Sequence, residues 1–315
     1  MAFSVLVEEK DSVQIITLRD ESNSTEAEIY SFGALLNSFS VTQKNKRINI
    51  IDGFSSPADV KENITKEFKS AKLSPFVCRM NKGEYTFNEQ SHKIQKFYLG
   101  DEAIHGLIYN APFDIKKYQA NNEKAFVHLS YGYNNKNEGF PFSYTTEVIY
   151  TLTANNNLSI QTIVTNTSNS EMPLNDGWHP YFKLGETVND LHVQFNSNTM
   201  LEFDSRLLPS GKIIPYEKFE TMNAFENTEL DNCFVLKDHT SPSCILKDNN
   251  SGIEFTITAD SSYPYLQVYT PPHRKSIAVE NLSSAPDSFN NHIGLIIAKP
   301  NEQYTFATSY QIKTM

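Results

Sequence analysis

Three short stretches of the sequence place a titratable side chain among apolar neighbours. His105 lies in "AIHGLIYNAPFDI", His179 in "NDGWHPYFKL" and Glu280 in "SIAVENL". Burying a carboxylate in an apolar strand costs hydration energy, so such a residue is expected to be paired or functional. Burial can also raise the pKa of the carboxyl group, so that it works as a general base near neutral pH. An imidazole can complement it as a general acid. A salt-bridged strand end and two structural histidines are equally compatible with these stretches taken singly.

The stretch 175–184 also holds the only tryptophan of the chain. Pro180 favours an extended conformation for His179, so Trp178 and Pro180 face one side of a strand, and His179 and Tyr181 face the other. Trp178 or Tyr181 can offer an apolar platform to the C–H face of a sugar, but an aromatic core edge has the same composition. We take both as candidate sugar contacts and expect His179 to point into the site.

A further polar stretch is "SPFVCRMNKGEYTFN", in which Arg79 and Asn81 precede a tight turn at Gly83. The planar guanidinium of an arginine can hold two oxygens at once, although a surface hairpin with a solvated arginine fits the segment too. His105, His179 and Glu280 are separated by 74 and 101 residues. Only the fold can bring such distant residues together.

The elements that must position these residues are mostly strands. "TEVIYTLTANNNLSIQTIVTN" alternates apolar and polar residues on both sides of an Asn cluster at 155–157, which predicts a β-hairpin. The clearest helix signal is "SSPADVKENITKEF", with Ser56 as N-cap and Pro57 at the first helical position. Without a repeat or linker, the sequence favours one all-β domain over residues 1–315, built as a large antiparallel β-sandwich.

The composition limits the possible partners. The formal net charge is −10, which disfavours binding to nucleic acid or to an anionic membrane surface. Three scattered cysteines (Cys78, Cys233 and Cys244) fit neither a disulfide framework nor a zinc site. The N-terminal residues do not resemble a signal peptide, and no apolar run approaches the ~20 residues that span a bilayer. We expect a reduced, cytoplasmic setting.

Several common catalytic motifs do not occur in the sequence. It contains no phosphate-binding G-x-x-x-x-G-K-[ST] loop, no G-x-G-x-x-G, no C-x-x-C, no H-E-x-x-H and no G-x-S-x-G nucleophile elbow. These absences disfavour nucleotide, dinucleotide and zinc enzymes as well as α/β-hydrolases.

Taken in order, the polar stretches resemble those of the aldose 1-epimerase (galactose mutarotase) family. The similarity covers roughly residues 30–310, with the stretches in the family's order and about its spacing. One departure is that "CRMN" stands where the family usually has an "NRI" turn. The matching stretches are "CRMNKGEYTF", "IHG" at 104–106, "HPYFKL" at 179–184, Leu230-Asp231 in "LDNCF", and "VENLSSAPDSFNN".

This resemblance implies a fold, a reaction and residue roles. The fold would be the family's β-supersandwich, with a sugar on a concave sheet face. Glu280 would remove the proton from the anomeric O1 hydroxyl, His179 would protonate the ring oxygen, and His105 would assist there. Arg79 and Asp231 would hold sugar hydroxyls, and Asn81 would make a further substrate contact. No organic cofactor and no metal would take part, because opening and closing a hemiacetal requires only proton transfer.

Two other functions remain open at this stage. An epimerase of hexose 6-phosphates would need clustered Arg and Lys side chains, and the acidic net charge disfavours it. A non-catalytic carbohydrate-binding module would have no need for an acid–base pair. We expect a small aldose as the partner and a monomer or homodimer as the assembly. A polysaccharide lyase or glycosidase-associated domain of similar architecture is a more remote alternative.

Overall fold

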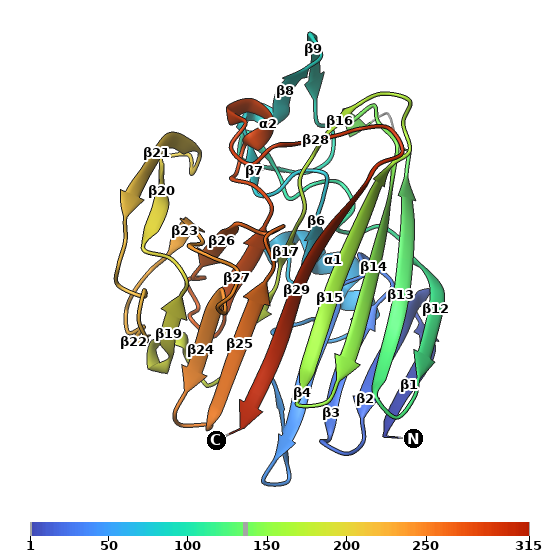
Figure 1. The fold of residues 1–315 in the computed structure, drawn as a ribbon, viewed down its shortest axis with the longest axis vertical. Coiled ribbons are helices and arrows are strands. Elements are labelled where there is room, and N and C mark those ends of the chain that lie inside the picture. Colours follow the sequence, from blue (N-terminus) through green and yellow to red (C-terminus); the bar gives the residue numbers. More distant parts are fainter. Residues whose placement is uncertain (1, 135–137, 315) are drawn as a thin grey trace.

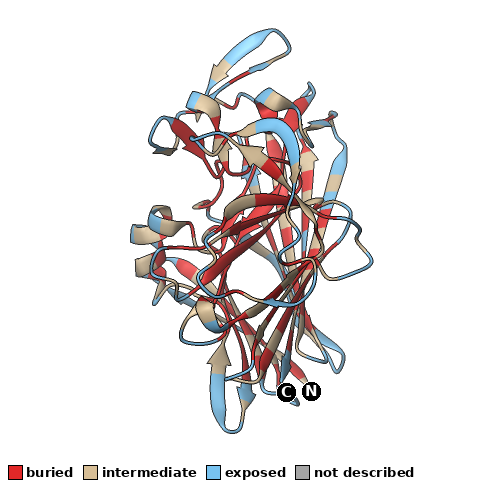
Figure 2. Cartoon of the chain, turned by 90° about the vertical axis from the view of Figure 1, so that its left-hand side faces the viewer, coloured by how far each residue is buried: buried red, intermediate tan, exposed pale blue. Residues whose placement is uncertain are grey.

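The computed structural model describes residues 2–134 and 138–314. Within these ranges most of the chain is β-strand, and antiparallel sheets form its layers (Figure 1). This confirms the predicted antiparallel β-sandwich. Buried residues lie along the inner strands, whereas exposed residues gather on the hairpins at the ends (Figure 2). One hydrophobic cluster includes Leu18, Val127 and Val279, which belong to three different sheets. The cluster therefore connects the three sheets, and the single domain stays a prediction.

The first two sheets form much of the framework. The first follows the chain order β1 (Phe3–Lys10), β2 (Val13–Asp20), β3 (Thr25–Tyr30), β4 (Leu36–Gln43) and β5 (Lys46–Asn49). The second has the order β12 (Asp114–Ala120), β13 (Lys124–Tyr133), β14 (Tyr144–Thr153), β15 (Asn157–Asn166), β29 (Gln303–Thr314), β25 (Ile253–Ala259), β24 (Cys244–Asp248), β19 (His192–Phe195) and β22 (Asn223–Ala224).

The third sheet and the short elements around it position the site. The sheet has the order β21 (Pro209–Pro215), β20 (Thr199–Phe203), β23 (Asp231–Val235), β26 (Tyr265–Tyr269), β27 (Ile277–Leu282), β17 (Gly177–His179) and β6 (Ala71–Leu73), and β18 (Tyr181–Phe182) also pairs with β27. The short elements are β7 (Arg79–Met80), β8 (Glu84–Phe87), β9 (Gln90–Lys93), β10 (Tyr98–Leu99), β11 (Glu102–Ile104), β16 (Met172–Leu174), β28 (Ile296–Ala298), α1 (Pro57–Glu67), α2 (Ser288–Asn291) and the 3-10 turns η1 (Asn81–Gly83) and η3 (Val188–Asp190).

Two local predictions are confirmed. Ser56 caps α1 by accepting a hydrogen bond from the backbone N–H of Asp59, and Pro57 begins the helix. The predicted hairpin is β14–β15, in which buried and half-buried residues alternate along β14. Asn155 and Asn156 turn the chain with left-handed φ values of 63° and 54°, which asparagine tolerates better than most residues. Local chemistry is sufficient to determine both elements.

The strand that carries Glu280 differs from the expected alternation. All six residues of β27 are buried, so the strand is covered on both faces. Such strands contain nearly continuous apolar sequence, as in Ile277–Val279. Glu280 is therefore enclosed by protein rather than placed at a hydrated strand end. Among the helices of the described residues, none has the length and apolar character needed to cross a bilayer.

Candidate active site

A cavity of about 230 Å³ opens on the third sheet. This volume is below the roughly 300–1,000 Å³ typical of drug-sized ligands, which suits one small molecule. Its walls come from β7, β11, β17, β18, β23, β26 and β27, from the end of α1, and from the β20–β21 hairpin. The lining residues that the sequence analysis selected are Arg79, His105, His179, Tyr181, Asp231 and Glu280. The fold thus brings six of the eight candidates together.

Glu280 and His179 face each other inside this cavity. Nε2 of His179 lies 3.4 Å from Oε1 of Glu280, and the two residues are 5% and 2% exposed, respectively. Their strands are held together because β17 pairs with β27 at Gly177 and Leu282. An acid and a base in this arrangement can act on two oxygens of the same ligand carbon, because such oxygens are themselves close neighbours.

His105 completes the group from a strained backbone. Its φ is 63°, and its backbone N–H donates to the carbonyl of Cys78 at 2.9 Å. The His105 and His179 rings meet edge to face, with centroids 4.8 Å apart. The following residue must be glycine: a Cβ at Gly106, whose φ is 76°, would lie 2.3 Å from the carbonyl oxygen of Ser74. The "HG" pair therefore has a structural cause.

Burial sets the protonation of the three titratable groups. It lowers the pKa of His179 from 6.5 to about 4. Burial also lowers the pKa of His105 well below its ordinary value, with smaller contributions from His179 and Arg79. Conversely, burial raises the pKa of Glu280 well above 4.5, and the nearby Asp231 carboxylate adds to this effect. The cavity therefore disfavours the charged form of each group.

A second cluster in the cavity is suited to binding hydroxyl groups. Nε2 of Gln267 donates to Oδ1 of Asp231 at 2.8 Å, and Gln267 stands opposite Glu280 in the β26–β27 ladder. Oε1 of Gln267 is buried and has no hydrogen-bond partner among the described residues. Burial raises the pKa of Asp231, whereas Arg79 and the Gln267 hydrogen bond oppose this. The cluster presents acceptors and a guanidinium to a polar ligand.

Gln267 and Cys78 are among the cavity residues that sequence reasoning missed. Gln267 interrupts the otherwise apolar centre of "YLQVY", and this buried polar position was the available signal. Cys78 lines the cavity beside Arg79, and its Sγ makes a long contact of 4.0 Å with Oε2 of Glu280. Its φ of 49° directs the side chain into the cavity, and a left-handed cysteine has no recognisable sequence signal.

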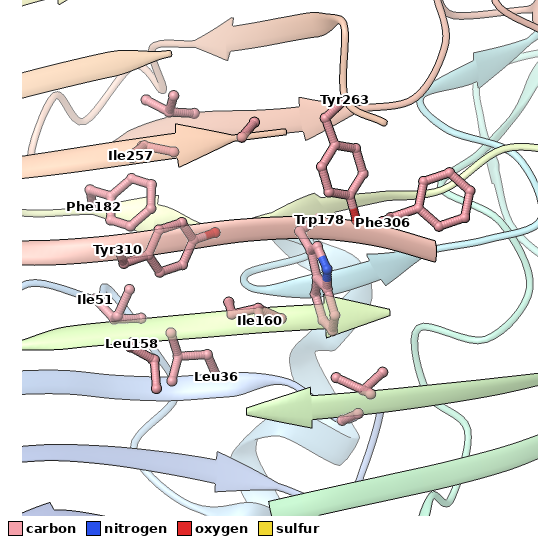
Figure 3. Close-up of a cluster of buried hydrophobic side chains, with 14 of the residues drawn as sticks. Leu36, Ile51, Leu158, Ile160, Trp178, Phe182, Ile257, Tyr263, Phe306 and Tyr310 are labelled. Carbon is pink, nitrogen blue, oxygen red and sulfur yellow. The ribbon is translucent and has the colours of Figure 1, made fainter. Parts of the chain in front are cut away.

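The structure places Trp178 elsewhere, and we no longer assign it a sugar contact. It is 3% exposed and lies in the hydrophobic core near Ile160 and Tyr310 (Figure 3). Its ring meets Tyr150 at a centroid distance of 6.1 Å, and Nζ of Lys72 lies 4.4 Å from the ring centroid. The strand alternation was predicted correctly, but the Trp178 face is the one turned toward the core. Tyr181 lines the cavity, stacked on His179 at 5.1 Å.

Asn81 also lies outside the cavity lining. Its Oδ1 accepts a hydrogen bond from Nη1 of Arg206 at 2.9 Å, and its backbone N–H donates to Oδ1 of Asp287 at 2.9 Å. The 3-10 turn η1 begins at this residue and carries it away from the side chain of Arg79. Asn81 therefore connects surface segments, and the predicted sugar contact is corrected.

Metal ligation finds no support among the described residues. Within residues 2–134 and 138–314, no three His, Cys, Asp or Glu side chains are grouped closely enough to hold a metal ion.

Residues 14–311 match the aldose 1-epimerase family. The chain belongs to this family. It is 26% identical over 251 residues to an aldose 1-epimerase of Streptococcus thermophilus, covering 74% of this chain and 71% of that protein. It is 21% identical to the galactose mutarotase of Sus scrofa, with 91% of each chain covered.

Solved structures agree on the fold. A galactose mutarotase-like protein of Clostridium acetobutylicum superposes with a TM-score of 0.86 at 21% identity, covering 100% of this chain and 99% of the other. A galactose 1-epimerase of Lactobacillus acidophilus gives 0.83 at 20% identity, covering 99% and 98%. As a member of the aldose 1-epimerase family, the protein is an isomerase that acts on sugars.

Proposed function

We propose that the protein is a mutarotase that interconverts the α and β anomers of an unphosphorylated hexose such as glucose or galactose. The observation that carries this proposal is the approach of Glu280 and His179 to 3.4 Å inside a cavity of monosaccharide size. The reaction requires a base at O1 and an acid at O5, and both oxygens are bonded to C1. The acid and the base must therefore be close neighbours.

In this mechanism Glu280 takes the proton of the O1 hydroxyl while His179 protonates O5, so that the C1–O5 bond breaks and an open-chain aldehyde forms. Rotation about C1–C2 followed by the reverse proton transfers gives the other anomer. His105 supports the ring oxygen, and Arg79, Asp231 and Gln267 bind hydroxyl groups. The chemistry consists of proton transfer alone and needs no cofactor.

One proton divided between Glu280 and His179 is sufficient for this cycle. Burial raises the pKa of Glu280 and lowers that of His179, which favours placing a shared proton on the carboxyl group rather than on the imidazole. Moving that proton to His179 creates the base and the acid together without changing the net charge of the site. The hydroxyl groups of a bound sugar stabilise the separated charges by hydrogen bonding.

Two observations favour this function over the alternatives. The cavity lining holds two cationic side chains, Lys66 and Arg79, but also the acids Glu67, Asp231 and Glu280, and such a mixture disfavours a phosphate group. A binding module would gain nothing from burying an acid–base pair, because each buried ionisable group costs desolvation energy. An unphosphorylated aldose and a catalytic site fit better.

The test compares the relaxation of freshly dissolved α-D-glucose and α-D-galactose, followed by polarimetry, with wild type, Glu280→Gln and Glu123→Gln. Glu123 is exposed and lies outside the cavity, so its variant controls for loss of a carboxylate. We expect Glu280→Gln to lose about 10²–10⁴-fold in kcat while calorimetry still detects sugar binding. A folded Glu280→Gln variant as active as wild type would refute the proposed mechanism.

A further inference from the structure

One cavity-lining residue has a backbone conformation that its side chain disfavours. Leu207 lies between β20 and β21 with a φ of 62°, in the left-handed region. Branched side chains rarely adopt this region, and such conformations persist where the surroundings impose them, often at functional sites. Phe68, Cys78 and His105 also line the cavity with positive φ, so four left-handed non-glycine residues border this one site.

Hydrogen bonds hold Leu207 in this conformation. Its backbone N–H donates to the carbonyl of Asp204 at 3.0 Å, and the Asp204 carboxylate accepts from the N–H groups of Arg206 and Leu208 at 2.8 and 3.1 Å. The turn is also anchored to the body of the protein, because Arg206 donates to Asn81 at 2.9 Å. Leu207 is therefore a fixed part of the cavity wall.

Apolar side chains surround the opening near this turn. Leu99 is 50% exposed although it lines the cavity, and it pairs with Glu102, whose Oε1 lies 3.9 Å from Nη1 of Arg206. Phe203, at the end of β20, lines the same cavity. An exposed leucine is not needed to hold the fold together, whereas it can contact a C–H surface of a ligand.

Burial indicates which end of a sugar reaches these residues. Glu280 and His179 are almost completely buried, whereas Leu207 is half-buried and Leu99 is half exposed. A sugar whose C1 lies against Glu280 then has its far end in the more exposed part of the lining, to which the two leucines belong together with Thr65, Lys66 and Glu67 at the end of α1. Hydroxyl, carboxylate or phosphate groups placed against the two leucines lose hydration without gaining a partner from the leucine side chains.

We propose that Leu207 is a specificity-determining residue that, with Leu99 and Phe203, forms an apolar mouth selecting aldoses with a methyl or C–H surface at the end remote from the anomeric carbon. This inference rests on the proposed function and narrows its substrate class to neutral sugars, with 6-deoxyhexoses preferred over hexoses and over hexose 6-phosphates or uronic acids. One buried methyl group supports a preference of about fourfold, which corresponds to about 0.8 kcal/mol.

The experiment measures kcat/KM for 6-deoxy-D-galactose, D-galactose and D-galactose 6-phosphate with wild type, Leu207→Gly and Leu207→Asn. We expect wild type to prefer the deoxy sugar about fourfold and the phosphate least. Glycine and asparagine both adopt the left-handed backbone conformation of position 207 with little strain. Leu207→Gly should bring the ratio of deoxy sugar to galactose close to one without lowering Tm, and Leu207→Asn should reverse the preference.

The control variant is Lys44→Gly, which changes an exposed left-handed residue in the β4–β5 turn, outside the cavity lining. It should leave the sugar ratio unchanged. Wild-type ratios in both Leu207 variants, or a fall in Tm for Leu207→Gly as large as for a core truncation, would overturn the proposal. If wild type accelerates the mutarotation of none of the sugars, the proposed activity is wrong. The ratios of Kd for the same three sugars, measured by calorimetry, then test the apolar mouth independently of catalysis.

Discussion

The position of Trp178 leads to a quantitative prediction for Trp178→Phe. The smaller ring leaves roughly 40 Å³ unfilled, which at about 24 cal/mol per Å³ costs ~1 kcal/mol. The substitution also removes the better cation–π partner of Lys72, a desolvated contact at 4.4 Å that is worth up to ~2 kcal/mol. We therefore expect the free energy of unfolding to fall by about 2–3 kcal/mol.

This loss converts into a measurable change in Tm. An entropy of unfolding of about 2.1 cal/mol/K per residue gives roughly 0.66 kcal/mol/K for the whole chain, so Tm should fall by about 3–5 °C. Because Trp178 contacts the core and not the cavity, KM for the sugar should remain at its wild-type value. Calorimetric unfolding and polarimetric kinetics on the same preparation measure the two quantities.

Tyr181→Phe provides the matched comparison, because Tyr181 lines the cavity three residues further along the chain. It should raise KM with a smaller loss of stability, since only a hydroxyl group is removed. The reasoning is refuted if Trp178→Phe raises KM severalfold at unchanged Tm, because that result would return Trp178 to the wall of the sugar site.

Three further outcomes follow from the charges of the site and of the core. Asp231→Asn should move the alkaline limb of kcat/KM to lower pH, because Asp231 helps to raise the pKa of Glu280 and the proposed mechanism needs the proton that Glu280 holds; a pH–rate profile measures the shift. His179→Asn should lower kcat by about 10²–10⁴-fold, whereas His192→Asn, outside the cavity, should match wild type in the same assay. Lys72→Met should cost about 3–5 kcal/mol in urea unfolding at pH 7, below the pKa of about 8 to which burial lowers Lys72, because it removes the ion-pair partner of the buried Asp176 carboxylate. The loss should be smaller at pH 5, because burial raises the pKa of Asp176 and its carboxyl group can then bind a proton.

Local signals in the sequence were sufficient for elements whose cause is local. The helix after Ser56 and the β14–β15 hairpin depend on capping, alternation and Asn turns within a few residues. The sugar site depends on pairings between distant strands: Gln267 stands opposite Glu280, and Asp231 stands opposite Tyr269. Only the resemblance to a family predicted that these residues meet, because no rule of spacing relates strands that are so far apart in the chain.

The two corrected residues show where sequence reasoning is weakest. Alternation placed Trp178 and His179 on opposite faces, but a tryptophan suits a core as well as a sugar platform. The omission of Cys78 and the wrong assignment of Asn81 both concern backbone conformation. A left-handed φ at Cys78 sends its thiol into the cavity, whereas η1 turns Asn81 toward Arg206. Positive φ at a cysteine, which lacks the local side-chain hydrogen bonds that let asparagine adopt it, comes from tertiary contacts, so composition does not reveal it.

Burial explains how two ordinary side chains can serve this reaction. In water, glutamate is a weak base and histidine is protonated only below neutral pH, so a proton would rest on neither group at pH 7. Enclosure raises the pKa of Glu280 and lowers that of His179, which favours the neutral form of both groups. In the proposed mechanism, the pair then donates and accepts one proton per cycle without exchange with solvent. The strained backbones at Cys78 and His105 are consistent with this requirement, because they bring polar groups together in a place where packing alone would favour apolar ones.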